Sequence, residues 1–207
     1  MRLHWGSPPI DNDFQPEVEG WTPMREPSPL LLNVIALPVA FVVGGLLIAG
    51  WTLANWSHVA PALQPAPLND EQDLIVFLAT AVLGLAGLIV VHELLHALAY
   101  PKFGFTSDVL IGIWPTKLLF YAVSLGIVSR TRMLVVYLLP LLVLSVLPLV
   151  ICLVLGISSN FLAVISVVNG MLASGDVAIV GMILWQIPAD AEMKNKGWPT
   201  WWRRIGS

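Results

Sequence analysis

The chain has 207 residues, of which 57% are hydrophobic and 11% are charged, and its formal net charge at pH 7 is −3. Soluble domains carry about 25% charged residues, so this composition excludes an ordinary soluble domain and indicates an integral membrane protein. Outside the C-terminal tail there is no basic patch interleaved with aromatic residues, which argues against nucleic-acid binding. A single cysteine, Cys152, excludes a disulfide within the chain.

Residues 1–29 are polar and rich in proline, which predicts a mostly irregular cytoplasmic tail. The apolar run that follows is long enough to cross a hydrocarbon core of about 30 Å, so we expect a first transmembrane helix over residues 30–54. Trp51 lies near the end of this run, a position typical of a membrane interface. We expect one transmembrane metallopeptidase-like domain over residues 30–190, and an aromatic and basic cytoplasmic tail over residues 191–207.

The second predicted transmembrane helix follows a short polar segment. Residues 55–72 hold three prolines followed by acidic residues, which predicts a loop with a helix start at Asn69 or Asp70. The next apolar run predicts a helix over residues 74–99. Residues 74–91 carry no charge, so the titratable residues of this helix are confined to its last turns.

Three titratable residues follow in that helix: His92, Glu93 and His96, in the pattern His-Glu-x-x-His. An ionised side chain at the centre of a membrane helix costs roughly 2.5–3.5 kcal/mol, so this group indicates a function. Residues i and i+4 share one face of a helix, so both imidazoles can bind one zinc ion. Glu93 stands beside them as a general base for a water molecule. The alternatives are a polar lining of the bundle interior or a structural ion site.

A different pattern occupies residues 105–132. Two short apolar runs, 109–114 and 117–123, flank Pro115 and are rich in β-branched and aromatic residues. Each is too short to cross a bilayer, which favours a small β-hairpin or a re-entrant element. Such backbone is tolerated at membrane depth only where protein or water covers it. The alternative is a helix lying on the bilayer surface.

Two further transmembrane helices are expected near the C-terminus, over residues 133–155 and 161–187. Pro140 and Pro148 predict kinks in the first of them. The predicted fold class is therefore an all-α integral membrane protein. It has four transmembrane helices, with the hairpin or re-entrant element between the second and the third.

The basic residues predict the orientation of the chain in the membrane. Four spans place both termini and residues 100–132 on one side, and every Lys and Arg falls on that side. The positive-inside rule makes this side cytoplasmic, so we expect a multi-pass protein of the prokaryotic cell membrane with both termini in the cytoplasm. The basic residues are Arg2, Arg25, Lys102, Lys117, Arg130, Arg132, Lys194, Lys196, Arg203 and Arg204.

A catalytic zinc site needs a third protein ligand and an open position for water. Asp176 is the remaining carboxylate within a predicted span, so it is the candidate. At about 1.5 Å per helical residue, Asp176 and His92 differ in depth by several ångströms, which a tilt or a break at Gly175 has to absorb. The alternative is a buried Asp176 paired with Asn169 or with a lysine at a helix end. Asn169 is a candidate for orienting substrate or a metal ligand, with a plain interhelical hydrogen bond as the alternative.

The motif HELLHA, the hairpin-like segment and a later span bearing Asn169 and Asp176 resemble the putative zincin peptidase family of small membrane proteins. That family is itself similar to site-2 intramembrane metalloproteases. The resemblance covers about residues 74–186. It implies that the two histidines of the motif and Asp176 are zinc ligands and that Glu93 is the general base. The chain has Ser-Gly-Asp where site-2 proteases usually have Leu-Asp-Gly, and it lacks their Asn-x-x-Pro spacing, so substrate binding by Asn169 is predicted from its position alone.

The sequence thus predicts a zinc-dependent, membrane-embedded metalloendopeptidase that cleaves membrane or membrane-proximal substrates with a zinc-activated water. Residues 109–123 are expected to bind the unwound substrate by strand addition. The expected partners are the lipid bilayer and a membrane-protein or peptide substrate. Two alternatives remain: a non-catalytic metal-binding membrane protein, such as a transporter or scaffold, and a membrane hydrolase of a non-peptide bond.

Overall fold

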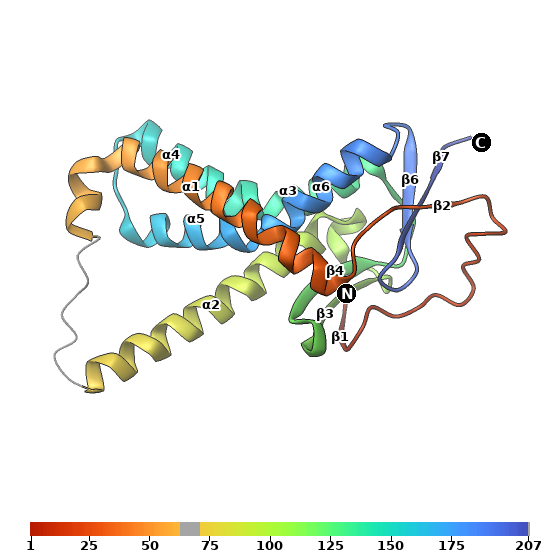
Figure 1. Ribbon diagram of the computed structural model, residues 1–207, viewed down its shortest axis with the longest axis horizontal. Helices are drawn as coiled ribbons and strands as arrows, with labels where there is room; N and C mark the ends of the chain where they lie inside the picture. Colours follow the sequence, from red (N-terminus) through yellow and green to blue (C-terminus); the bar gives the residue numbers. More distant parts are fainter. Residues whose placement is uncertain (63–70, 207) are drawn as a thin grey trace.

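The computed structural model describes the backbone of residues 1–62 and 71–206, and the side chains of residues 1–54 and 71–206. Within these residues the chain is mostly helical, with two small β-sheets gathered at one end (Figure 1). The predicted helix start at Asn69 or Asp70 lies outside the described residues.

In the described part of the chain, three helical runs are long and apolar enough to cross a membrane: Pro29–Ala54, Glu71–Ala99 and Arg130–Leu155. They coincide with the first three predicted spans. The last two helices pass the same test only when they are counted as one bent span. The helices are α1 (Pro29–Ala62), α2 (Glu71–Ala99), α3 (Arg130–Leu141), α4 (Leu147–Leu155), α5 (Asn160–Leu172) and α6 (Ser174–Gln186).

The backbone of α1 continues past the predicted end of the first span as far as Ala62. Trp51, which the sequence predicts at a membrane interface, faces the protein interior. Its side chain is 3% exposed, and its indole Nε1 donates a hydrogen bond of 2.9 Å to the hydroxyl of Ser166 on α5. A buried indole needs such an acceptor, so Trp51 ties α1 to α5.

The third helical run is interrupted, as its two prolines predict. A π-helical turn, η3 (Leu142–Val146), separates α3 from α4, and Pro140 and Pro148 lie on either side of it. A proline has no N–H to donate to the carbonyl four residues earlier, so it breaks the helical hydrogen-bond ladder. The interruption therefore leaves backbone carbonyls in this run available to other partners.

The fourth run is not the single helix predicted over residues 161–187. α5 and α6 meet at Ala173 with a bend of 48°, in a segment rich in glycine and serine. Gly170 lets α5 lie close against α1, since a Cβ there would come within 2.2 Å of the Cδ1 of Leu47. The break puts Asp176 in the first turn of α6.

The predicted hairpin is confirmed: β3 (Val109–Trp114) and β4 (Leu119–Ser124) are antiparallel and joined by the 3-10 turn η2 (Pro115–Lys117). β1 (Arg2–Trp5) pairs in parallel with the other edge of β3, so the order of the sheet is β1-β3-β4. The prediction of an irregular N-terminal tail is wrong for this segment, because the open edge of β3 gives its amides hydrogen-bond partners. β4 remains an edge strand.

A second sheet has the order β2-β7-β6-β5 and contains residues predicted as a C-terminal tail. The prediction of an all-α fold is therefore wrong. In β6, Ala191, Met193 and Asn195 are buried while the two residues between them are less so, which is the alternation of a strand with one covered face. The strands are β2 (Thr22–Pro23), β5 (Val128–Ser129), β6 (Ala191–Asn195) and β7 (Thr200–Arg204).

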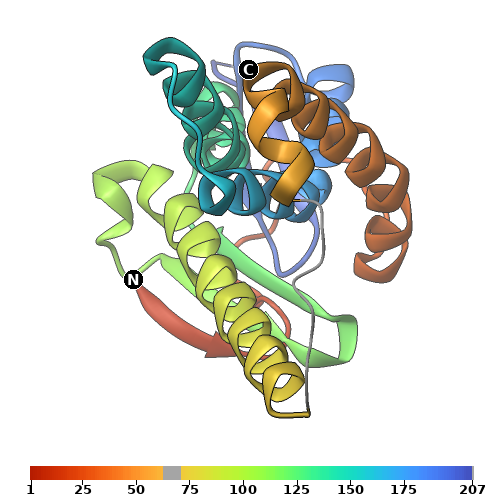
Figure 2. The same cartoon turned by 90° about the vertical axis from the view of Figure 1, so that its left-hand side faces the viewer.

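The hydrophobic core lies where the helices meet the two sheets. α2 joins it only through its last turns, which the 3-10 turn η1 (Pro101–Gly104) follows, and none of its most apolar stretch is buried. Figure 2 shows α2 in front of the first sheet, with α1, α4 and α5 beside it. The core comprises Met24, Leu32, Ala97, Ala99, Tyr100, Val109, Val128, Met133, Val136, Ile179, Ile183, Ile187, Ala191 and Met193.

All ten Lys and Arg residues lie at the sheet end of the molecule, in the sheets, in the turns beside them or at the start of α3. The opposite end carries the acidic Glu71 and Asp73 at the start of α2, and no Lys or Arg occurs in residues 55–72 or 156–160. The charge segregation expected from the sequence is therefore also a segregation in space.

Glu26 fastens the segment before α1 to the β6–β7 hairpin. Its carboxylate accepts hydrogen bonds from the backbone N–H and the hydroxyl of Thr200. Nearby, the N–H of Met24 donates to the Thr200 carbonyl over 2.9 Å, and Trp198 Nε1 donates to the Pro27 carbonyl over 3.1 Å. Burial raises the pKa of Glu26 from its ordinary value of 4.5 to about 7.

We expect the β6–β7 hairpin to loosen as the pH rises from 4.5 to about 7. In that range the unfolded chain has released the Glu26 proton and the folded chain still holds it, so stability falls with rising pH, by roughly 3 kcal/mol at most. Glu26→Gln keeps an acceptor for the Thr200 N–H and cannot ionise, so the stability of its β6–β7 hairpin should not change over this pH range. Hydrogen exchange of β6 and β7 amides, corrected for intrinsic rates, measures this. The prediction is contradicted if the exchange rates of wild type and Glu26→Gln depend on pH in the same way.

Candidate metal centre

The His-Glu-x-x-His segment forms the last turns of α2, where that helix enters the core. His92 and His96 lie on one face, with ring centroids 4.8 Å apart and Nε2 atoms 3.1 Å apart. Each of the two residues is 5% exposed. The i, i+4 spacing thus brings the two imidazoles together, as the sequence predicts.

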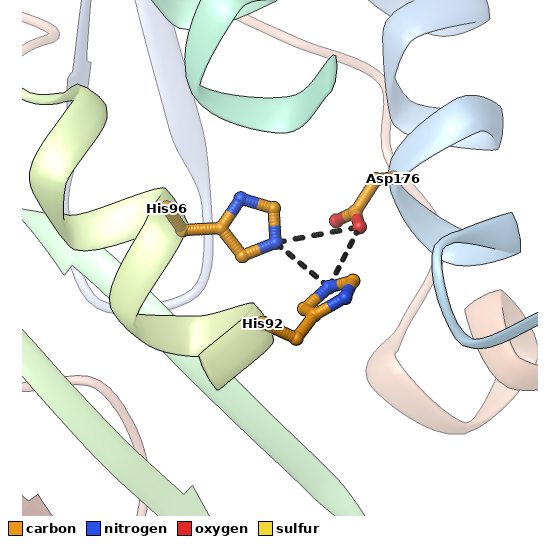
Figure 3. A group of neighbouring side chains, drawn as sticks. All are labelled: His92, His96 and Asp176. Atoms are coloured by element: carbon orange, nitrogen blue, oxygen red, sulfur yellow. Dashed lines mark hydrogen bonds and ion pairs between the residues drawn. The ribbon is translucent and has the colours of Figure 1, made fainter. Parts of the chain in front are cut away.

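Asp176 reaches the same point from α6, and Figure 3 shows its carboxylate directed at both rings. Its Oδ2 lies 3.2 Å from His92 Nε2 and 3.3 Å from His96 Nε2. The depth difference expected between α2 and a straight fourth span is absorbed by the break at Ala173, two residues before the predicted position at Gly175. The alternative pairing of Asp176 with Asn169 or a lysine is not observed among the described residues.

The other ring nitrogen of each histidine is also engaged. His96 Nδ1 donates to the backbone carbonyl of Val136 over 2.7 Å, and His92 Nδ1 donates to Asn169 Oδ1 over 2.9 Å. Because the Nδ1 atoms carry the protons, the Nε2 atoms present lone pairs. Two lone pairs and a carboxylate oxygen therefore face one another in a buried space, an arrangement that is unfavourable without a cation between them.

This donor set fits zinc. Bonds of about 2.0–2.1 Å in a tetrahedron place neighbouring ligand atoms about 3.3 Å apart, close to the separations observed here. His92, His96 and Asp176 form a group close enough to bind a metal ion. Three protein ligands leave a fourth position for water, as in catalytic zinc sites.

Unlike His92, His96 and Asp176, Glu93 has a buried polar atom that makes no hydrogen bond to the described residues. Its side chain is 8% exposed, and Oε2 is buried without a hydrogen-bond partner in the described part of the chain. An isolated buried carboxylate oxygen is costly, so its retention here points to a partner that arrives with the reaction. The geometry is that of a proton acceptor beside the metal ligands.

A cavity of about 640 Å³ opens onto these residues. It is mostly apolar, which is typical of ligand sites. Its walls come from α1, from the length of β4, from the junction of α5 and α6, and from the β6–β7 hairpin. Lining residues include Ala36, Ala40, His92, Glu93, His96, Leu118, Phe120, Ala122, Tyr137, Asp176 and Trp198.

A family model described as "Putative zincin peptidase" matches residues 85–191, which is more than half of the chain. The chain belongs to this family. The resemblance inferred from the motif is thereby confirmed, and the zincin peptidase family implies zinc as the metal. The matched region begins within α2, ends just beyond α6 at Ala191, and contains the whole His92, His96 and Asp176 group. No curated protein and no solved structure matches the chain, and the similarity to site-2 proteases stays a prediction.

The sequence did not identify the hydrogen-bond acceptors of the Nδ1 atoms of His92 and His96. Nothing at Val136 itself marks its carbonyl as an acceptor, because every residue has a carbonyl. Pro140, four residues later, was the available signal: its missing N–H leaves that carbonyl without its usual helical partner.

Detergent-purified protein should contain about one zinc ion per chain, and His96→Ala and Asp176→Ala should lose it, because each removes one of three ligands. Metal analysis after dialysis measures this. His4→Ala is the control, since His4 lies in β1 and bonds to the carbonyl of Ser7. A chelator should lower the melting temperature of wild type and the control only. Zinc retained without Asp176 would contradict the three-ligand site.

Proposed function

We propose that this protein is a zinc-dependent membrane-embedded metallopeptidase that hydrolyses peptide bonds of membrane or membrane-proximal substrates. The observation that carries the proposal is the convergence of His92, His96 and Asp176 beside Glu93, whose buried Oε2 has no hydrogen-bond partner among the described residues, at the wall of a large cavity. Family membership supports the reaction class. A site that only stored a metal would not need an unpaired base beside it.

The residues of the site have different roles in the proposed hydrolysis. When bound, zinc supplies Lewis acidity that lowers the pKa of the attacking water and polarises the scissile carbonyl. Glu93 accepts a proton from that water as the C–O bond forms, and then delivers it to the amine nitrogen as the C–N bond breaks. The two histidines and Asp176 hold the metal, and the apolar walls of the cavity exclude bulk water.

The open edge of β4 suggests how substrate is held. Leu125 N–H donates to the Asp108 carbonyl over 3.0 Å, and the antiparallel alternation then directs the peptide groups of Phe120 and Ala122 away from β3. In agreement, the Ala122 carbonyl accepts a hydrogen bond from the Tyr100 hydroxyl over 3.4 Å. A peptide unwound from its helix can therefore add to this edge as a strand, next to the metal site.

The position of the site in the membrane follows from the charge distribution. The sheet end carries all the basic residues, so the positive-inside rule makes it the cytoplasmic end, with both termini. The exposed apolar surface of α2 is then covered by lipid. On this proposal the metal site opens near the cytoplasmic face of a cell membrane.

Glu93→Gln should keep zinc and lose hydrolysis, by a factor on the order of 10²–10⁴, because the amide cannot take the proton of the water. Zinc content and product analysis by mass spectrometry, on liposomes holding single-span membrane proteins and on soluble peptides, measure the two properties. A non-catalytic transporter or scaffold would be indifferent to the substitution. Zinc-loaded wild type that cleaves no peptide bond would contradict the proposal and favour the metal-binding or non-peptide hydrolase alternatives.

Strand addition predicts that Phe120→Pro cleaves more slowly than Phe120→Ala, by about tenfold, because only the proline removes a backbone donor from the open edge. Both variants lose the same aromatic ring, so the alanine variant controls for side-chain contacts. Zinc content should be unchanged in both. Equal cleavage rates in the two variants would exclude pairing of substrate with β4.

A further inference from the structure

The interrupted third run supplies the groups that hold both metal-binding histidines. Pro140 lacks an N–H, so the carbonyl of Val136, four residues earlier, has no α-helical donor. His96 Nδ1 donates to that carbonyl over 2.7 Å. The proline thus converts a helical carbonyl into a fixed acceptor for one ligand.

The second histidine is held indirectly, through Asn169. Asn169 Oδ1 accepts from His92 Nδ1 over 2.9 Å, and its Nδ2 donates to the Pro140 carbonyl over 3.0 Å and to Ser145 Oγ over 2.9 Å. Pro140 and Ser145 are brought to the same side by the π-helical turn η3. A carbonyl can only accept, so it fixes which end of the amide is nitrogen, and Oδ1 must face His92.

Asn169 belongs to a buried polar chain that reaches α1. Ser166 Oγ donates to the Ser145 carbonyl over 2.8 Å and accepts from Trp51 Nε1 over 2.9 Å. Asn169, Ser145 and Ser166 are all 0% exposed. Every polar side-chain atom of these three residues has a hydrogen-bond partner, and a buried network of this kind holds its members in one geometry.

We propose that Asn169 is a positioning residue that fixes the ring orientation and the tautomer of His92, so that the Nε2 lone pair faces the metal. This inference rests on the metal centre of the proposed function and not on proteolysis. Groups that accept a hydrogen bond from the second nitrogen of a metal-binding histidine set both its orientation and its basicity. The proline-interrupted helix is the rigid support of this outer shell.

The geometry does not support the predicted role of Asn169 in substrate binding. Asn169 is absent from the residues that line the cavity, and both polar atoms of its amide are engaged. A substrate group cannot reach it without displacing His92 or the π-helical turn.

Two substitutions separate the positioning role from packing. Asn169→Leu has a similar volume but no acceptor, so the zinc affinity of the purified protein should fall by about 10- to 100-fold. Asn169→Asp keeps an oxygen facing His92 Nδ1, and its protonated form can donate to the Pro140 carbonyl, so its zinc affinity should stay closer to that of wild type than that of Asn169→Leu. Competition with a chromophoric chelator measures the dissociation constant, and the absorption spectrum of the Co²⁺ form reports the ligand geometry without reference to activity.

Ser166→Ala is the matched control, since it removes hydrogen bonds to Trp51 and Ser145 from the same buried layer and does not touch Asn169. It should melt at a lower temperature and bind zinc as wild type does. The proposal is overturned if Asn169→Leu binds zinc as tightly as wild type, if Ser166→Ala weakens zinc binding equally, or if wild type binds no zinc. Zinc binding that depends on Asn169 in a protein without peptidase activity would uphold this inference and refute the proposed function alone.

Discussion

Nε2 of His92, Nε2 of His96 and Oδ2 of Asp176 are buried at separations of 3.1–3.3 Å. Three hydrogen-bond acceptors this close together require a positive charge between them, and the rest of the site depends on this constraint. Each nitrogen presents a lone pair because its ring partner donates to a fixed acceptor. In apolar surroundings such acceptors are stable only around a cation. This candidate metal site is thus a point at which α2 and α6 are joined.

Breaks in the helices, rather than the helices themselves, place the polar groups of this site. The bend at Ala173 brings Asp176 to the depth of the histidines. The break between α3 and α4 releases carbonyls that an intact helix would use internally, and these hold His96 directly and His92 through Asn169. An apolar helical bundle has few polar groups to offer, so interrupted backbone becomes the main source of acceptors near the metal.

The two sheets determine how the site is reached. β4 lines the cavity as an edge strand, and the β6–β7 hairpin, held by Glu26, forms another part of the cavity wall. The metal ligands therefore lie between an apolar helical region, which suits a membrane segment, and a strand edge, which suits an extended chain. A peptide bond has to be free of its helix before it can be attacked, and this arrangement offers the released backbone new hydrogen-bond partners.

Local patterns were enough to predict the His-Glu-x-x-His helix, the β3–β4 hairpin, the first three spans and the interruption at Pro140 and Pro148, because each depends on neighbours within a few residues. Asp176 was found by elimination, as the only other carboxylate in a predicted span. The strands at the chain ends were missed, since β1 pairs with residues more than a hundred positions away. Pro140 marks the Val136 carbonyl as free in the sequence. Which donors reach the carbonyls of Val136 and Pro140, and the burial of Trp51, were decided by tertiary structure. A hydrogen-bond partner is set by where two helices meet, and that meeting point leaves no local pattern in the sequence.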